Sequence, residues 1–75
     1  MILDDVALDV PVRITGFVSV DETERARLSG LGLRAGVTVT KLIPTPLRDP
    51  VSCLVGLQLL ALERRLLRRI RVEAA

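Results

Sequence analysis

Very few residues of this 75-residue chain have side chains that commonly perform chemistry. The sequence contains no histidine and one cysteine, Cys53. Without histidine, neither a Ser-His-Asp nor a Cys-His catalytic arrangement is possible, and the most common nitrogen ligand of metal ions is missing. A single thiol forms no intramolecular disulfide and no zinc finger. We therefore expect a protein that is not an enzyme and whose fold depends on its apolar core.

The remaining metal-ligand candidates are Cys53 and the carboxylates of Asp4, Asp5 and Asp9. Carboxylate oxygens suit a hard cation, but acidic residues scattered along a terminal segment are more often ordinary surface charge. An inward-facing cysteine on a strand behaves as a small hydrophobic residue. We predict no metal site and no cofactor.

Charge is distributed unevenly along the chain. Residues 1–24 contain six acidic residues and one arginine, a net charge of −5, whereas residues 25–75 contain ten basic and three acidic residues, a net charge of +7. The densest basic stretch, residues 63–71, either touches phosphates or acidic headgroups or is a solvated face that keeps the domain soluble. Phe17 is the only aromatic residue, so nucleic-acid bases have almost nothing to stack on. We favour the solvated face and expect no nucleic-acid partner.

Length and hydropathy patterning indicate that residues 1–75 form one soluble domain. Hydrophobic residues are 49% and charged residues 27% of the chain, which is too apolar for a disordered tail. The longest uncharged stretch, Pro50 to Leu62, is shorter than the roughly 20 apolar residues that cross a bilayer. The N-terminus carries acidic residues where a signal peptide carries basic ones. We expect a cytoplasmic protein with no membrane insertion.

The first half of the chain predicts a strand, a helix and a second strand. Val10, Val12 and Ile14 alternate with polar or turn-forming neighbours as in a half-buried strand. Pro11 means that this strand begins there or lies at an edge, and Gly16 allows a bend or bulge. A helix is predicted from Asp21, in capping-box form, to about Leu31, followed by Gly32 as a left-handed C-cap. Residues 37–43 predict a strand whose odd positions share one face, with Lys41 as the discordant member; a bulge or a barrel end would free its ammonium group.

The second half begins with a loop and continues into an ambiguous segment. Residues 44–50 contain three prolines and predict a stiff, ordered loop. Residues 51–72 fit two patterns. As a hairpin, Val51, Cys53 and Val55 face inward, residues 56–58 turn, and Leu60 and Leu62 return inward on the partner strand. As a helix, residues at spacings of three and four form an apolar stripe beside arginines, typical of a membrane-surface element; they are Leu59, Leu62, Leu66 and Ile70. The residues alone do not decide between them.

The ordered motifs of the chain resemble those of the FeoA family, the small cytoplasmic component of bacterial ferrous iron transport. The resemblance lies in Leu-Gly-Leu at residues 31–33, Arg-Ala-Gly at 34–36, the Pro-Leu-Arg-Asp-Pro loop at 46–50 and Leu-Ala-Leu at 60–62. It covers nearly the whole chain, the first residues only loosely. Two positions depart from the family pattern. Arg48 stands where glycine is usual, and an arginine disfavours a positive φ there. In the hairpin, Gly56 comes one position earlier than the family's glycine, and Leu57 stands at the position that this glycine usually occupies.

The resemblance implies a mainly β fold, an SH3-like small β-barrel of about five strands with a short inserted α-helix. It favours the hairpin for the ambiguous segment, followed by a short helical turn over residues 63–68 and a closing strand over residues 69–72. Barrel closure also protects such apolar strands from aggregation at their edges. The predicted core consists of Val12, Ile14, Leu28, Leu31, Val37, Val39, Val51, Cys53, Val55, Leu60, Leu62 and Val72.

Several leucines remain outside that core and are more apolar surface than an isolated monomer usually exposes. We predict that they contact a partner together with the proline-rich loop. The predicted partner-contact residues are Leu42, Leu47, Arg48, Asp49, Pro50, Leu54, Leu57 and Leu59.

The resemblance implies a non-enzymatic accessory protein of ferrous iron (Fe2+) uptake that docks on the GTPase-bearing membrane permease FeoB and is recruited through it to the inner face of the membrane. The same leucines are also compatible with a homo-oligomer. Two other functions stay open: an SH3-like regulatory domain of the iron-dependent repressor type, and a small basic nucleic-acid-binding barrel that uses residues 64–71.

Overall fold

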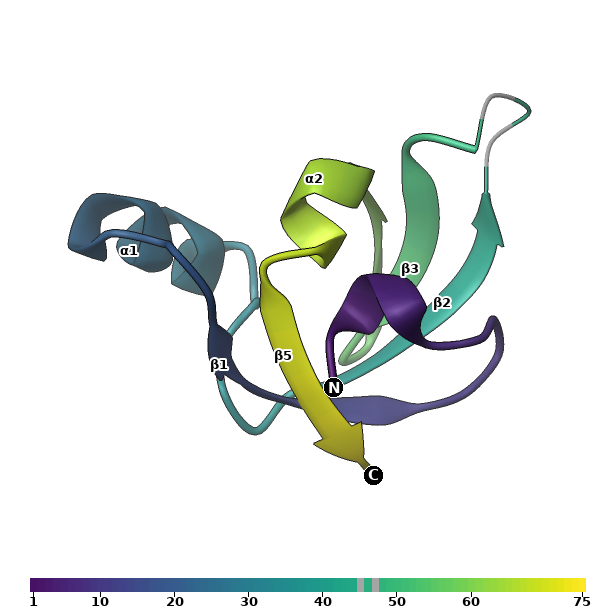
Figure 1. Cartoon of the computed structure of the whole chain (residues 1–75), viewed down its shortest axis with the longest axis horizontal. Helices are drawn as coiled ribbons and strands as arrows, with labels where there is room; N and C mark the ends of the chain where they lie inside the picture. Colours follow the sequence, from purple (N-terminus) through teal and green to yellow (C-terminus); the bar gives the residue numbers. More distant parts are fainter. Residues whose placement is uncertain (45, 47) are drawn as a thin grey trace.

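The computed structural model describes residues 1–44, 46 and 48–75, and its secondary structure is mainly β. Five antiparallel strands form one sheet in the order β4-β3-β2-β1-β5. The strands are β1 (Val12–Phe17), β2 (Thr38–Pro44), β3 (Val51–Val55), β4 (Gln58–Leu62) and β5 (Ile70–Ala74). The helices are the 3-10 helix η1 (Leu3–Asp5), α1 (Glu22–Gly30) and α2 (Arg64–Leu67) (Figure 1). None of these helices is long and apolar enough to span a membrane.

Residues 51–62 form the predicted hairpin and not a helix. β3 and β4 pair without a register shift from Val51–Leu62 to Val55–Gln58. Gly56 occupies the first of the two turn positions with a φ of 59°, the positive value that a type II′ turn requires there. The predicted helical turn and closing strand are present as α2 and β5.

Two bulges curve the sheet. The pairing of β1 with β5 shifts between Ile14 and Gly16, as the glycine predicted. The pairing of β2 with β3 shifts between Lys41 and Ile43, so that Leu42 is the extra residue on β2. This second bulge corrects the expected alternation: Ile43 does not share the face of Val39 but is 70% exposed.

Helix α1 begins and ends at local signals. The Asp21 side chain accepts a hydrogen bond of 2.8 Å from the Glu24 N–H, the predicted N-cap. At the other end, Gly32 has a φ of 93°, and the N–H groups of Gly32 and Leu33 donate to Ser29 and Leu28 carbonyls at 3.0 and 2.9 Å. These two bonds define a Schellman motif, in which the residue after the glycine packs against the last turn.

The Schellman motif corrects the prediction that Leu31 is a core residue. Leu31 is 42% exposed, whereas Leu28 and Leu33 are both fully buried. The chain reverses at Gly32, so Leu33 is directed back toward Leu28 and Leu31 is left outside.

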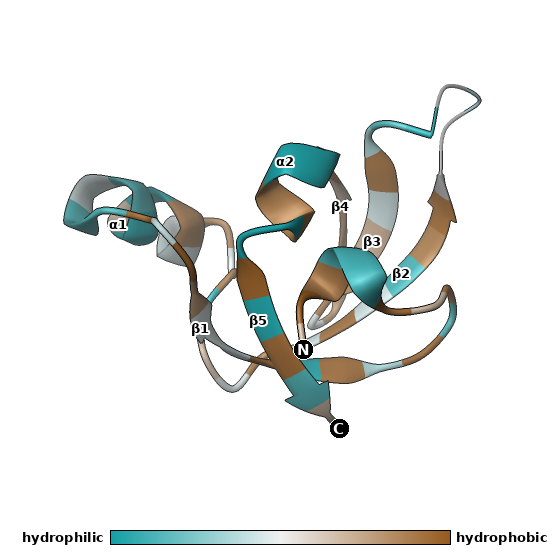
Figure 2. Cartoon of the chain, in the orientation of Figure 1, coloured by the Kyte–Doolittle hydropathy of each residue, from teal (hydrophilic) through white to brown (hydrophobic). Residues whose placement is uncertain are grey.

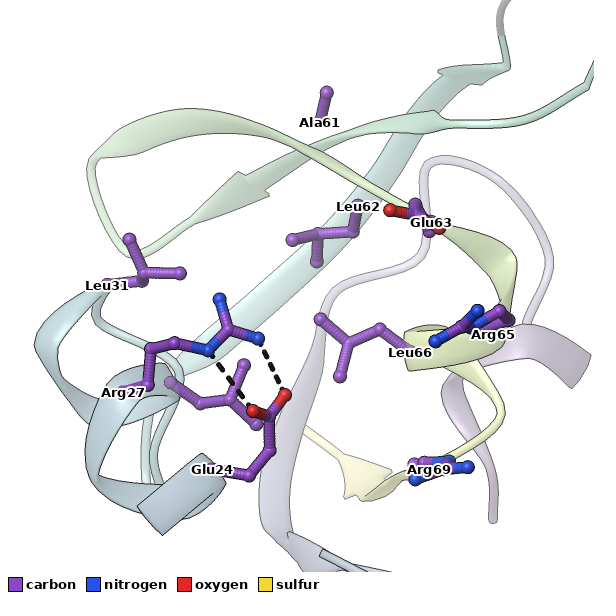
Figure 3. Close-up of a pocket in the computed structure, with 10 residues that line it drawn as sticks. Glu24, Arg27, Leu31, Ala61, Leu62, Glu63, Arg65, Leu66 and Arg69 are labelled. Atoms are coloured by element: carbon purple, nitrogen blue, oxygen red, sulfur yellow. Dashed lines mark hydrogen bonds and ion pairs between the residues drawn. The ribbon is translucent and has the colours of Figure 1, made fainter.

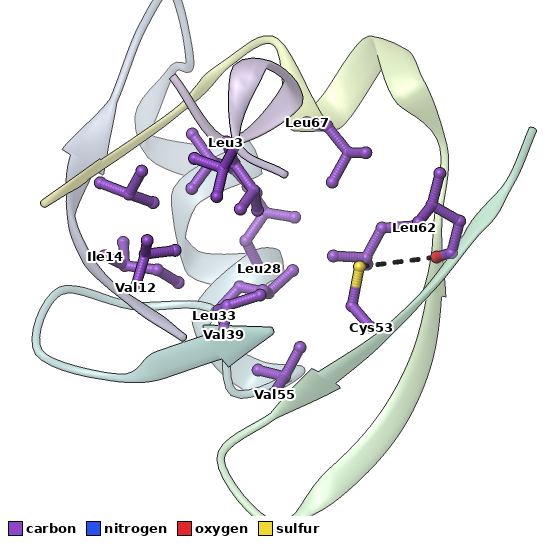
Figure 4. Close-up of a cluster of buried hydrophobic side chains, with 14 residues drawn as sticks. Leu3, Val12, Ile14, Leu28, Leu33, Val39, Cys53, Val55, Leu62 and Leu67 are labelled. Carbon is purple, nitrogen blue, oxygen red and sulfur yellow. Dashed lines mark hydrogen bonds between the residues drawn. The ribbon is translucent and has the colours of Figure 1, made fainter. Parts of the chain in front are cut away.

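The core otherwise follows the prediction and adds five residues to it (Figure 4). Nine of the predicted residues are buried, and Val37 and Leu60 are half-buried and pack against the cluster. The additional buried residues come from the N-terminal segment, from the position after Gly32, from α2 and from the start of β5: Leu3, Val6, Leu33, Leu67 and Ile70.

Lys41 is buried, contrary to the expectation that its ammonium group is freed. It is 4% exposed, and its Nζ donates a 3.0 Å hydrogen bond to the Asp4 carbonyl oxygen of η1. The bulge turns Ile43 outward but leaves Lys41 facing inward opposite Cys53. The lysine thereby ties the N-terminal segment to β2.

Arg48 also differs from its prediction. Its φ is 66°, so the loop keeps the left-handed conformation even with an arginine in place of glycine. This conformation costs a residue with a Cβ about 1–2 kcal/mol. Residues 45 and 47 lie outside the described part of the chain.

Candidate functional site

Half of the eight exposed large apolar side chains among the described residues lie on β2 and on the β3–β4 hairpin. The other four, Met1, Leu8, Val10 and Leu31, lie before β1 and after α1. Leu54 and Leu59 face each other across the hairpin, and both point away from the core. Leu59 is 65% exposed, and Leu57 in the turn is fully exposed. Ile43, which the sequence analysis missed, adds to this surface. We call Ile43, Leu54, Leu57 and Leu59 the outer apolar face.

The other predicted contact residues are arranged around this face. Leu42 and Pro50 are half-buried, and Arg48 and Asp49 are exposed, whereas Leu47 lies outside the described residues. Asp49 Oδ1 accepts a 3.0 Å hydrogen bond from the Arg64 N–H, and the Arg48 carbonyl oxygen accepts one of 2.6 Å from Arg64 Nε. These bonds anchor the loop to the first residue of α2.

β4 is the last strand of the sheet on its side. In a two-residue hairpin the pair that flanks the turn exchanges hydrogen bonds, and the bonded pairs then alternate along the ladder. Gln58, Leu60 and Leu62 therefore bond to β3, whereas Leu59 and Ala61 direct their N–H and C=O groups away from it. Among the described residues, no backbone group of another element bonds to these outward groups.

A cleft of about 230 Å³ lies beside β4, between α1 and α2 (Figure 3). Leucines from α1, β4 and α2 give it an apolar lining. Gln58, at the start of β4, donates a 2.7 Å hydrogen bond from its Nε2 to the carbonyl oxygen of Leu31. Charged residues line its rim. We call this cleft the α1–α2 groove; its lining consists of Glu24, Arg27, Leu28, Leu31, Ala61, Leu62, Glu63, Arg65, Leu66 and Arg69.

One ion pair within the groove is already satisfied. Arg27 donates to both carboxylate oxygens of Glu24, at 2.6 Å from Nη2 and 3.1 Å from Nε. This hydrogen bonding lowers the pKa of Glu24 and raises the pKa of Arg27. Arg65 and Arg69 lie on the opposite wall, and Arg69 Nη1 donates to the Ser19 carbonyl oxygen at 3.2 Å. The groove therefore offers positive charge at its α2 wall.

Cys53 lies on β3, opposite Leu60 of β4, and is fully buried. Burial raises the pKa of its thiol to about 11, although the nearby Lys41 charge acts in the opposite direction. A thiol with such a pKa is a poor nucleophile and a poor metal ligand at neutral pH. Across residues 1–44, 46 and 48–75, no three Cys, Asp or Glu side chains are grouped closely enough to hold a metal ion.

Phe17 is placed in a second hollow, of about 520 Å³, on another face of α1. Arg25 and Arg34 also line this hollow, which is thus where the aromatic ring and arginines come together. Phe17 nevertheless packs against the core and is half-buried, so its ring offers a limited stacking surface.

Sequence reasoning missed Ile43, Leu31 and the open side of β4. The exposure of the Ile43 side chain depends on the bulge in β2, and the exposure of the Leu31 side chain depends on the chain reversal at Gly32. The open side of β4 depends on strand order, which residue alternation does not encode. The one signal in the sequence was the uncharged stretch from Pro50 to Leu62, which contains both strands of the hairpin.

Comparison with known proteins gives a family model and solved structures. The family model described as FeoA domain matches residues 1–74. The solution structure of iron(II) transport protein A from Clostridium thermocellum has a TM-score of 0.85 and 29% sequence identity, and the match covers 100% of this chain and 46% of that chain. This chain therefore spans less than half the length of that relative. No curated protein matches the chain.

Two further structures support the fold. The FeoA protein of Chlorobium tepidum has a TM-score of 0.86 and 28% identity, with 99% of this chain and 70% of that chain covered. The FeoA of Stenotrophomonas maltophilia, solved in complex with zinc and described as a procaryotic SH3 domain protein, has a TM-score of 0.78 and 22% identity, with 97% and 89% covered. The predicted SH3-like fold with its inserted helix is confirmed.

Proposed function

The chain belongs to the FeoA domain family, and from this premise we propose that it is a non-enzymatic accessory protein of ferrous iron uptake. Family membership implies a role in ferrous iron transport. Our proposal adds that the chain acts in the cytoplasm by docking on the GTPase-bearing part of the permease FeoB, and that its own residues perform no chemical step.

The observation that carries the proposal is the outer apolar face. Leu57, in the turn of the hairpin, is fully exposed, and Leu59, two residues later on β4, is 65% exposed. Ile43 on β2 is 70% exposed. Exposed large apolar side chains that gather on one face typically mark a protein contact. The described residues include no histidine and no cysteine besides the buried Cys53, which favours a docking role over catalysis.

Binding to the purified cytoplasmic region of the permease tests the proposal. We expect Leu57→Asp and Leu59→Asp each to weaken binding at least tenfold, because each places a charge in an apolar contact, and to leave the fold intact. Val10→Asp is the matched control: Val10 is 43% exposed, and it precedes β1, which is separated from β4 by β2 and β3. Absence of binding by the wild-type chain, or equal loss in all three variants, would contradict the proposal.

A pull-down from detergent-solubilised membranes of iron-starved source cells tests the same proposal without assuming the partner. We expect the wild-type chain to retain a large GTPase-containing ferrous iron permease. Retention of nucleic acid that washes off in salt would instead support the nucleic-acid-binding alternative, because phosphate contacts weaken steeply with salt.

A further inference from the structure

We propose that the partner contributes an extended segment that lies in the α1–α2 groove and pairs with the open side of β4 as a sixth strand. This inference rests on the proposed function only for the identity of the partner. The occupant is defined by its chemistry: a segment with apolar side chains at alternate positions and carboxylates near the α2 wall.

The first support is the hydrogen-bonding capacity of β4. Leu59 and Ala61 direct two N–H and two C=O groups away from β3, and no backbone group of another described element bonds to them. An extended peptide satisfies such groups through main-chain hydrogen bonds, which provide affinity without requiring a particular side chain.

The second support is the absence, along β4, of features that normally protect an edge strand. Its residues, Gln-Leu-Leu-Ala-Leu, include no charge and no proline, and its pairing with β3 contains no bulge. Charged side chains, prolines and bulges are the devices by which proteins prevent pairing at exposed edges. β4 is therefore open to strand addition.

The third support is the match between a strand's alternation and the surfaces on either side of β4. Every second side chain of an added strand would face the groove, where Leu31, Leu62 and Leu66 offer apolar contacts. The remaining side chains would extend the row formed by Leu54 and Leu59 on the outer apolar face. At about 230 Å³ the groove is below the usual volume of small-molecule sites, roughly 300–1,000 Å³, and suits a few strand side chains.

Charge specifies the chemistry of the segment. Glu24 is paired with Arg27 through two hydrogen bonds and also feels the charge of Arg69. The groove lining contains three arginines, Arg27, Arg65 and Arg69, and only two carboxylates, Glu24 and Glu63, so it keeps an excess of positive charge. Carboxylates on the partner segment complement these arginines. A second copy of this chain that paired through its own β4 is a poor occupant, because the Gln-Leu-Leu-Ala-Leu strand carries no carboxylate for these arginines.

The test measures binding of the permease's purified cytoplasmic region to wild-type chain and variants. Ala61→Pro removes an outward N–H at an edge position, where proline is tolerated, and we expect it to weaken binding at least tenfold. The matched control is Glu22→Pro, at the first position of α1, where the N–H is not needed for the helix. Arg65→Glu is expected to weaken binding severalfold, with Arg71→Glu, on β5, as its equal-charge control.

Hydrogen exchange locates the contact in the same complex. We expect the Leu59 and Ala61 amides to become protected when the partner binds. Binding that leaves these amides unprotected and tolerates Ala61→Pro would overturn strand addition while leaving the proposed function intact. Dimerisation of the free chain that Ala61→Pro abolishes would also overturn it, because the occupant would be a second copy.

A random peptide display library tests the inference if the permease region does not bind, an outcome that contradicts the proposed function alone. Selection of peptides with alternating apolar residues and carboxylates by the wild-type chain, but not by Ala61→Pro, would support strand addition. Selection of no peptides, or of the same peptides by both chains, would overturn it.

Discussion

The two edge strands of the sheet, β5 and β4, differ in what pairs with their outer sides. On β5, the Ile2–Arg71 bridge and a 2.8 Å hydrogen bond from the Val72 N–H to the Met1 carbonyl oxygen cover the side away from β1. The strand also alternates apolar and charged residues, visible as brown and teal bands in Figure 2. Among the described residues no backbone group pairs with the outer side of β4, and the strand carries no charge. β5 thus has two of the features that normally prevent pairing at an exposed edge, and β4 has neither of them. This difference favours β4 as the edge at which a further strand pairs.

Residues 1–5 cover the outer side of β5, and we call them the cover over β5. This segment is itself part of the core. Leu3 of η1 is fully buried, and Asp4 of the same helix pairs with Arg64 of α2 at 3.0 Å and with Arg68, the residue after α2, at 3.4 Å. Removing this cover would therefore uncover core side chains, whereas nothing in the core depends on the outer side chains of β4. This difference leads to four predictions, ordered by the size of the expected effect.

Truncating a residue of the cover is expected to have the largest effect. Leu3→Ala should lower the free energy of unfolding by about 2–5 kcal/mol, because it removes a fully buried side chain and leaves a cavity. Leu59→Ala should change it by less than about 0.5 kcal/mol, because the side chain is exposed. Urea denaturation of the two variants measures both values. Similar losses in both would mean that β4 is as integrated into the fold as the cover over β5.

Alkaline pH is expected to have the next largest effect, through Cys53. The folded state keeps the thiol protonated up to about pH 11, whereas the unfolded chain loses the proton near pH 9.0. Between these values the unfolded state binds fewer protons, so stability falls as pH rises, by on the order of 2 kcal/mol over the window. Comparing urea denaturation of wild type and Cys53→Ala from pH 8 upward isolates this slope. Equal slopes would show that the Cys53 thiol is solvated in the folded state.

The ion pairs that hold the cover to α2 are expected to contribute less. Asp4→Ala should lower the free energy of unfolding by about 1 kcal/mol, because the Asp4 side chain is 18% exposed and bonds to two arginines. Asp5→Ala is the matched control, since Asp5 is exposed and has no hydrogen bond or ion pair through its side chain to another described residue. Thermal denaturation at low and high salt distinguishes them: only the Asp4 effect should shrink with salt. An equal effect at Asp5 would mean that charge number matters and pairing does not.

Local signals made part of the fold predictable. The N-cap at Asp21, the reversal at Gly32 and the bulge at Gly16 each depend on one residue type in one backbone conformation. The hairpin was different, because residues 51–72 fit a strand period and a helix period equally, and only the family resemblance favoured the strands. Leu3 was missed for a further reason: its burial depends on β5 and α2, which are distant in sequence.

The exposed side chains of the candidate site could be predicted from the sequence, but the open backbone of β4 and the groove beside it could not. Alternation along the hairpin identified Leu54 and Leu59 as outward-facing, and the predicted turn left Leu57 outside the core. All three are exposed in the structure. The open backbone of β4 and the groove beside it depend on which strand ends the sheet and on where α1 packs. These are properties of the assembled fold, and hydrophobic periodicity contains no information about them.

The last prediction involves no change in stability and compares the two edges directly. In the free chain, the Val72 amide should exchange with solvent as slowly as core amides, because its hydrogen goes to the Met1 carbonyl oxygen. The Leu59 and Ala61 amides should exchange orders of magnitude faster than that of Leu60, which bonds to β3. Hydrogen exchange followed by NMR resolves these amides individually. Slow exchange at Leu59 and Ala61 would mean that β4 already has a partner in the free protein, and fast exchange at Val72 would mean that the cover over β5 opens; in either case the asymmetry that favours strand addition at β4 would be lost.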